Sequence, residues 1–251
     1  VFLAAGTQSK AAVNMGVKQT GAGSSYVDLA WDAQLGAGHY HTQFSQDGKN
    51  WIDMDNSSSP SESVYNLTQG ASYYARVVAY KGSHYTGTHV MIGVSETAIV
   101  STKPTEVSGL TQTAAGVNSV SMSWNASAGA ASYVIYGYIN YNWTQIGTSA
   151  TNSATITGVA ATTSTRFSVA AVKNVTGGTV TGDQCSGVEM KAIPIKVSRI
   201  AMQYYWDSLK EAKYIWTDVN NADGYQYEVK SANGKKTYFR ATSTNSYTYV
   251  K

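Results

Sequence analysis

Residues 27–40 decide the fold, and they read VDLAWDAQLGAGHY. The Trp, Ala and Tyr of this stretch return with the same internal spacing twice more, which gives Trp31, Ala37 and Tyr40, then Trp124, Ala130 and Tyr133, then Trp216, Ala222 and Tyr225. Successive tryptophans are 93 and 92 residues apart. A period of that size is typical of one β-sandwich, which takes about 100 residues. The sequence therefore predicts three copies of one unit.

The alternation of residue types within the copies predicts β-strands. Gln19-Thr20 in the first copy corresponds to Gln112-Thr113 in the second, and before each Trp apolar residues alternate with small or polar ones. This period of two predicts half-buried strands. A later strand repeats on the same schedule, as Tyr73, Ala75, Val77 and Ala79 and as Thr165, Phe167, Val169 and Ala171. Only Asp207–Lys213 has a helical period, so the predicted fold class is all-β.

With a Trp on the second strand, Ala-x-x-Tyr entering the third and Tyr-x-x-x-Val-x-Ala on the sixth, the chain resembles fibronectin type III domains over nearly its whole length. The resemblance implies tandem Greek-key β-sandwiches. It implies no ligand, because this scaffold hosts many unrelated roles. The second copy departs from the family pattern at Thr165, where a corner tyrosine is usual.

Prolines mark the expected boundaries, since a residue without an N–H suits a junction between sheets. Cuts at Pro104 and Pro194 predict sandwiches over residues 17–104 and 105–194 and a partial sandwich over residues 195–251. The third copy lacks a Val-x-Ala strand after Trp216, so we expect it to be incomplete at its C-terminus.

Residues 1–16 form a separate segment in this division. Val1, Leu3 and Ala5 alternate like a strand, and Ala11, Val13 and Met15 alternate like a second one. One interpretation is a terminal hairpin that belongs to a preceding sandwich, or that completes the third copy of another molecule and joins copies head-to-tail. The other is the tail of a secretion signal.

Composition narrows the function classes. Charged residues make up 13% of the chain and the net charge is +3, too little for the basic stripe that nucleic-acid binding needs. No apolar run approaches the roughly 18 residues of a membrane span, so no membrane insertion is expected within this segment. Cys185 is the single cysteine and has no partner for an intrachain disulfide. The balance predicts a secreted or cell-surface protein.

Catalytic patterns are not found: the sequence has no nucleophile–base order, no phosphate loop and no metal spacing with the flanking structure that such chemistry requires. We therefore expect no enzyme and no cofactor. The histidines are His39, His41, His84 and His89, all in the first copy. A transition-metal site there is conceivable, but solvated histidines are the commoner outcome, and we assign no metal ligand.

Four aromatic residues are the candidate binding site: Tyr136, Tyr138, Tyr141 and Trp143. Tyr136 and Tyr138 are out of phase with the core positions of their strand, so we expect them to point outward. An outward aromatic row can stack on sugar rings, and it can equally pack against a neighbouring domain or strengthen cross-strand pairs. In the first copy, Asp47-Gly48 predicts a tight primed turn, in a hairpin similar to those of fibronectin type III-like modules of bacterial glycanases.

These features favour a non-catalytic extracellular structural or adhesive protein, either a spacer or a fibre-forming subunit. The alternatives are a carbohydrate-binding ancillary region of a secreted polysaccharide-degrading enzyme and a domain string that decorates a virion. The expected partners are copies of the same chain or a polysaccharide.

Overall fold

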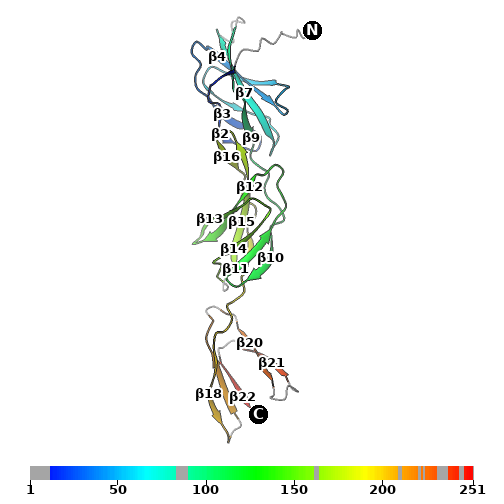
Figure 1. Ribbon diagram of the computed structural model, residues 1–251, viewed down its shortest axis with the longest axis vertical. Coiled ribbons are helices and arrows are strands. Elements are labelled where there is room, and N and C mark those ends of the chain that lie inside the picture. Colours follow the sequence, from blue (N-terminus) through cyan, green and yellow to red (C-terminus); the bar gives the residue numbers. More distant parts are fainter. Residues whose placement is uncertain are drawn as a thin grey trace.

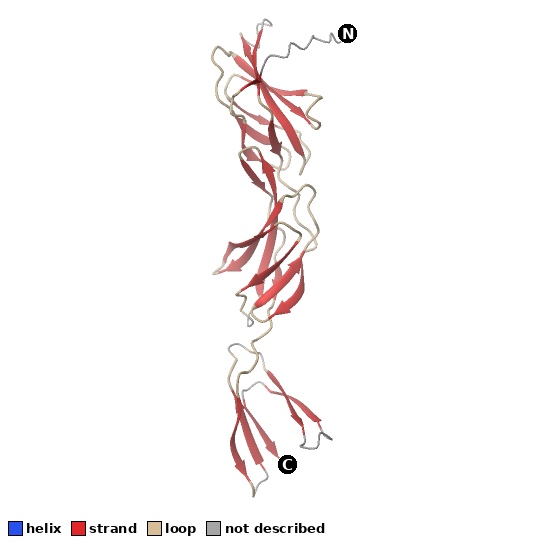
Figure 2. Cartoon of the chain, viewed as in Figure 1, coloured by secondary structure: helices blue, strands red, loops and turns tan. Residues whose placement is uncertain are grey.

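The computed structural model describes residues 12–250 except 83–89, 161–163, 209–210, 220–221, 223, 231–236 and 243–245. Its strands form three groups that follow one another along the long axis (Figure 1). Strands and loops make up the described chain (Figure 2). We refer to β1–β9 as the first sandwich, β10–β17 as the second sandwich and β18–β22 as the third unit.

The first sandwich packs a large sheet against a small one. The strands are β1 (Ala12–Val13), β2 (Lys18–Ala22), β3 (Val27–Ala30), β4 (His39–Ser45), β5 (Ile52–Ser57), β6 (Ser61–Val64), β7 (Ser72–Lys81), β8 (Val90–Ser95) and β9 (Ala98–Ser101). The large sheet has the order β1-β8-β7-β4-β5, with β9 also paired to β7, and the small sheet has the order β2-β3-β6. All neighbours are antiparallel except β1 and β8.

The second sandwich repeats this order. Its strands are β10 (Thr111–Gly116), β11 (Ser119–Ser123), β12 (Ser132–Ile139), β13 (Asn142–Ser149), β14 (Ser153–Thr157), β15 (Thr165–Val175), β16 (Gly178–Thr181) and β17 (Val188–Met190). One sheet is β10-β11-β14, and the other is β13-β12-β15-β16 with β17 on β15. This is the predicted fibronectin type III-like sandwich, and the predicted fold class is confirmed.

The third unit starts the same pattern. Its strands are β18 (Ile200–Trp206), β19 (Glu211–Trp216), β20 (Tyr225–Lys230), β21 (Thr237–Thr242) and β22 (Ser246–Val250), in the sheets β18-β19-β22 and β20-β21. The end of Asp207–Lys213, the one segment with a helical period, belongs to a strand, because Glu211–Trp216 pairs with strands on both sides. Ladder hydrogen bonds on two edges outweigh the weak preference of so short a segment.

The Trp and Tyr of each copy make the same contact in all three units. Ring centroids lie 5.4, 5.2 and 5.5 Å apart, and ring planes meet at 68°, 67° and 67°, in the pairs Trp31–Tyr40, Trp124–Tyr133 and Trp216–Tyr225. Aromatic rings prefer this edge-to-face arrangement. Each tyrosine hydroxyl also accepts a hydrogen bond from the backbone N–H three residues after the tryptophan, at Gln34, Ser127 and Val219. The tryptophans are 3–7% exposed, so all three lie in the core of their units.

The repeated Gln-Thr dipeptide has a structural role. The side chain of Gln19 donates to the carbonyl of Ser101 (2.8 Å) and accepts from its N–H (2.9 Å), and Gln112 makes the same two bonds with Lys191 (2.8 and 3.1 Å). In both strands the register shifts after the glutamine, so the following threonine is the extra residue of a bulge. The glutamine thereby links β2 to β9 in the first sandwich, and β10 to the residue after β17 in the second.

The N-terminal boundary differs from the prediction. Ala12 and Val13 pair with Val94 and Ser95 of β8, and Met15 is 1% exposed in the core of the first sandwich. The cut after residue 16 is therefore wrong, because these apolar side chains fill the edge of their own sandwich. The hairpin interpretation fails for its second strand for the same reason. Its first strand lies outside the described residues.

Candidate functional site

The four predicted aromatic residues lie on the β12–β13 hairpin of the second sandwich. Tyr138 pairs directly with Trp143, with ring centroids 5.2 Å apart and planes at 61°. Tyr138 is 39% exposed and Trp143 36%, whereas Tyr136 is half-buried opposite Gln145. Tyr133 and Ile135, which precede these residues on β12, point into the core. Tyr136 and Tyr138 are out of phase with them, which agrees with the predicted outward direction. Whether the row binds a ligand stays a prediction.

Tyr141 stands apart at the hairpin tip. Asn140 and Tyr141 form a two-residue turn with φ of 50° and 64°, and Tyr141 is 90% exposed. This left-handed conformation suits Asn and Gly, and it disfavours a side chain such as Tyr by roughly 1–2 kcal/mol. An exposed aromatic ring is thus held where the fold alone would favour glycine.

The ring of Trp143 also lies close to Gly187, in the segment before β17. A Cβ on Gly187 would stand 2.7 Å from Cη2 of Trp143 and 3.4 Å from Nε of Arg166. The indole edge of Trp143 and the guanidinium of Arg166 therefore both lie close to the backbone of Gly187. Arg166 lies on β15 opposite Glu189, whose carboxylate accepts from the hydroxyl of Ser164. Sequence reasoning missed Arg166 and Gly187, because they are distant from the hairpin along the chain.

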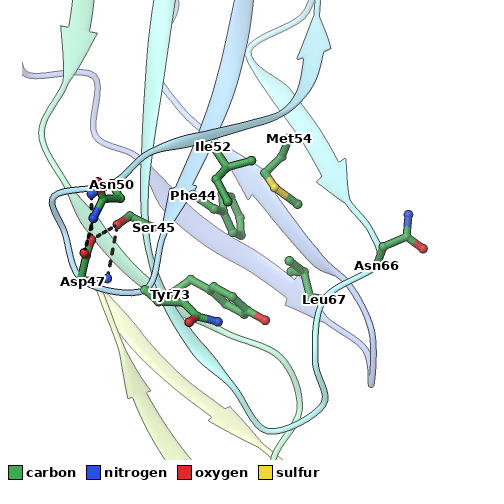
Figure 3. Close-up of a pocket in the computed structure, with 10 residues that line it drawn as sticks. Phe44, Ser45, Asp47, Asn50, Ile52, Met54, Asn66, Leu67 and Tyr73 are labelled. Atoms are coloured by element: carbon green, nitrogen blue, oxygen red, sulfur yellow. Dashed lines mark hydrogen bonds between the residues drawn. The ribbon is translucent and has the colours of Figure 1, made fainter.

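A recess opens at one edge of the first sandwich, with a volume of about 480 Å³. Figure 3 shows its apolar side chains, Phe44, Ile52, Met54, Leu67 and Tyr73, gathered beside the β4–β5 loop. Phe44 and Leu67 are core residues, and Ile52 is 66% exposed at the rim. The recess was not predicted, since it is built from β4, β5 and the segment before β7. It offers an apolar surface with a polar rim.

The polar rim is a loop held by Asp47. One carboxylate oxygen accepts from the N–H groups of Lys49 and Asn50 (both 2.8 Å) and from the hydroxyl of Ser45 (2.9 Å), and the other accepts from the Asn50 amide (2.7 Å; Figure 3). The backbone hydrogen bond from Asn50, and then that from Lys49, hold the pKa of Asp47 far below its usual value. The predicted primed turn is wrong: residues 46–51 separate the strands, and of Asp47 and Gly48 only Gly48 has a positive φ, of 70°.

The described histidines form no metal site. His39 is 3% exposed and stacks on Tyr80 with centroids 5.2 Å apart, and His41 Nδ1 lies 4.0 Å from the Asp53 carboxylate. Within the described residues, no group of three or more His, Cys, Asp or Glu side chains is placed to hold an ion. His84 and His89 lie outside those residues. The expectation that His39 is solvated is wrong, because Tyr80 and the chain at Gly82 cover it.

Specific hydrogen bonds connect the first and second sandwiches at their junction. The N–H of Thr176, after β15, donates to the carbonyl of Ile99 in β9 (2.8 Å), and the N–H of Ile99 donates to the hydroxyl of Thr176 (2.7 Å). Lys173 donates to the carbonyl of Gly70 and is only 4% exposed. The turn of the second sandwich thus extends the sheet edge of the first.

Charged and packing contacts reinforce this junction. Nζ of Lys103 lies 2.6 Å from the Asp183 carboxylate. Pro104 is buried, and a Cβ on Gly182 would stand 3.0 Å from its carbonyl oxygen. Burial lowers the pKa of Lys173. None of these pairs was predicted from the sequence.

No protein-family model and no curated protein matches this chain. Among solved structures, the chain is similar to a segment of two fibronectin type III domains from chicken tenascin, with 15% identity over 70% of this chain and 97% of that one and a TM-score of 0.36. It is also similar to the FN1–FN3 domains of chicken CNTN1, with 16% identity over 93% and 86% and a TM-score of 0.33. The fold assignment rests on the strand order and the repeated Trp–Tyr pair.

Within the described residues, no helix has the length and apolar character to cross a bilayer.

Proposed function

We propose that this chain is a non-catalytic extracellular structural protein, in which the first two sandwiches form a stiff rod that acts as a spacer. The observation that carries the proposal is the junction around Ile99 and Thr176, where one backbone–backbone hydrogen bond and one hydrogen bond from a backbone N–H to a side-chain hydroxyl join the sandwiches. A spacer needs a fixed distance between its ends. Independent domains joined by a plain linker reorient, whereas a built interface holds one orientation.

Three contacts restrain motion at the junction. Gly70, Ile99 and Lys103 of the first sandwich contact, in that order, Lys173, Thr176 and Asp183 of the second. A bend or twist that relieves one contact strains another. Lys173 adds directional restraint more than attraction, because burying a lysine beside a carbonyl partly offsets the hydrogen bond it gains.

The connection to the third unit is of another kind. The four consecutive residues 193–196 are all exposed to solvent, and Ile195 is 52% exposed. In Figure 1 one loop segment connects the second sandwich to the third unit. We therefore expect a stiff segment of two sandwiches followed by a looser joint.

The low charge content supports an extracellular setting for such a rod, because Ser, Thr, Gly, Asn and Tyr fill the surface positions that Lys and Glu usually occupy. The non-catalytic role is supported by the site geometry: the groups gathered at the recess and at the hairpin are apolar, aromatic or bonded to one another.

Small-angle X-ray scattering on the chain tests the proposal. A compact protein of 251 residues has a radius of gyration of about 18 Å. We expect a clearly larger value and the distance distribution of an elongated particle. The double variant Lys173→Ala/Thr176→Ala should broaden that distribution. A compact particle, or a distribution that the double variant leaves unchanged, would contradict the proposal.

A further inference from the structure

Two tryptophans occupy the same place on the outer sheet face of the first and second sandwiches. Trp143 lies opposite Tyr138 in the β12–β13 pair. The β4–β5 register pairs Phe44 with Ile52, and continuing it by one residue brings Trp51 opposite Ser45. Tyr138 stands five residues after Tyr133, as Ser45 stands five after Tyr40. Trp51 and Trp143 are therefore equivalent, although the loops before them differ in length.

Each of these tryptophans has an arginine near it, on β7 in the first sandwich and on the corresponding β15 in the second. In the first sandwich the Cζ of Arg76, on β7, lies 4.0 Å from the ring centroid of Trp51. In the second, the Arg166 guanidinium on β15 and the Trp143 ring both lie close to Gly187. The β7 and β15 strands correspond to each other. Arg76 pairs with Gln43, whereas Ser168 pairs with Tyr136, the equivalent of Gln43, so Arg166 lies at the next position along the same face of the sheet. The pairing of Trp with Arg is thus repeated by different residues of the same strand.

The fold does not require this tryptophan. In the third unit the corresponding register position pairs Lys230 with Thr237, so the same hairpin forms without an aromatic residue there. A large ring left partly exposed gains less from burial than a core residue does. Its presence at the same position in two sandwiches therefore calls for a role outside the core.

The first-sandwich arginine is held in place. Its Nε donates to the side-chain oxygen of Gln43 (2.8 Å), and the Gln43 amide donates to Asp53 (2.7 Å). These bonds fix the guanidinium over the indole. Preorganised planar donors beside an aromatic ring reduce the ordering that binding would otherwise require.

We propose that the Trp51–Arg76 and Trp143–Arg166 pairs are two equivalent binding sites for the pyranose rings of a polysaccharide. The sites are open strips of sheet and not closed pockets, which fits a chain ligand that lies along a surface. The indole supplies an apolar face for the sugar ring, and the neighbouring guanidinium, amide and carboxylate groups supply donors and acceptors for its hydroxyls. This proposal does not depend on the spacer role.

Two sites on one chain make a specific prediction for polymers. When one site holds a polymer, the second site binds it at a raised effective concentration, so the polymer binds more tightly than a short oligosaccharide. Loss of either tryptophan should weaken polymer binding by about 100- to 10,000-fold, because it removes that advantage. Loss of both should abolish binding.

The test uses the whole chain and affinity electrophoresis in gels that contain one polysaccharide each. The panel consists of neutral polymers (xylan, mannan, a mixed-linkage β-glucan) and uronic-acid polymers (polygalacturonate, alginate). Retardation by either group supports the proposal, and the comparison shows whether the sugar carries a carboxylate. Trp51→Ala and Trp143→Ala should each reduce the retardation, and the double variant should migrate as in a gel without polymer.

Two further variants separate binding from folding. Gly187→Ala removes no side chain but places a methyl group 2.7 Å from the Trp143 ring, so it should displace the ring and reduce retardation while the thermal melt changes little. Tyr65→Ala is the matched control, since Tyr65 is 56% exposed on the other sheet beside Tyr26, and it should bind like the unmodified chain. The proposal is overturned if no polymer retards the chain, if the double tryptophan variant binds normally, or if Tyr65→Ala loses binding equally.

Discussion

The ammonium group of Lys173, in the second sandwich, donates a hydrogen bond to the backbone carbonyl of Gly70 in the first, and the lysine is only 4% exposed. A lysine is seldom so deeply buried. Here it is covered because the turn after β15 lies against the end of the first sandwich, where Thr176 and Ile99 exchange hydrogen bonds. This relationship is a direct contact between the first two sandwiches.

The repeated Trp–Tyr pair leads to a stability prediction. Trp124 is 3% exposed and packs edge-to-face on Tyr133. Replacing a buried tryptophan with alanine costs about 3–5 kcal/mol, a large part of the 5–15 kcal/mol that holds a domain folded. Trp124→Ala should therefore unfold or strongly destabilise the second sandwich in a thermal melt. Exposed Trp206→Ala is the control, and an unchanged melting curve for Trp124→Ala would contradict the core assignment.

Cys185 is expected to be replaceable by serine but not by valine. Its sulfur accepts a hydrogen bond from the N–H of Val169 (3.3 Å), and in the first sandwich the hydroxyl of Ser95 accepts from the N–H of Val77 (2.8 Å). Serine thus already fills this role in the sister unit. Cys185→Ser should change the free energy of unfolding by less than about 1.5 kcal/mol.

Cys185→Val replaces the sulfur with a slightly larger apolar group and leaves the buried Val169 N–H without its partner, at a cost of about 1–3 kcal/mol. Urea denaturation of both variants under reducing conditions measures the difference. If valine is tolerated as well as serine, the sulfur is only a filler of the core.

Acid should weaken the β4–β5 loop through Asp47. Hydrogen bonds from Asn50, Lys49 and Ser45 depress its pKa in the folded chain, so the carboxylate stabilises the fold fully above its ordinary pKa of 3.8. That contribution is lost as pH falls from this value towards the lower folded pKa. Asp47→Ala should thus destabilise the first sandwich at pH 7, and the gap should narrow as the pH falls below 3.8. Urea denaturation at several pH values would contradict this if the gap stayed constant.

The sequence predicts the sandwiches well because their signals are local and repeated. Alternation before Trp31 and Trp124 and the fixed Trp-to-Tyr spacing depend only on neighbouring residues and on the copies themselves. The meaning of Gln19 and Gln112 could not be predicted, although their repetition was visible. Their partners are 82 and 79 residues away, and a single sequence does not indicate such pairings.

The candidate binding sites could not be predicted in full, because their residues are distant from one another in the sequence. Trp51 and Trp143 are 92 residues apart, one fewer than Trp31 and Trp124, because the loops before them differ in length. The strand register is needed to show that they are equivalent. Arg166 and Gly187 come from other strands than the predicted aromatic row. At the N-terminus the alternation of Val13 and Met15 correctly indicated a buried strand, but not which sandwich it belongs to. Periodicity gives the face of a strand and leaves its partner open.

The measurement that tests the central claim most directly is the distance distribution between two spin labels in the whole chain. With Cys185→Ser as background, labels at exposed Lys81 and Thr144 report on the first two sandwiches, and labels at exposed Thr144 and Gln203 report on the joint to the third unit. We predict a narrow distribution for Lys81–Thr144, a broader one for Thr144–Gln203, and broadening of the first in the Lys173→Ala/Thr176→Ala variant. A Lys81–Thr144 distribution as broad as the other in the unmodified junction would contradict a rigid rod.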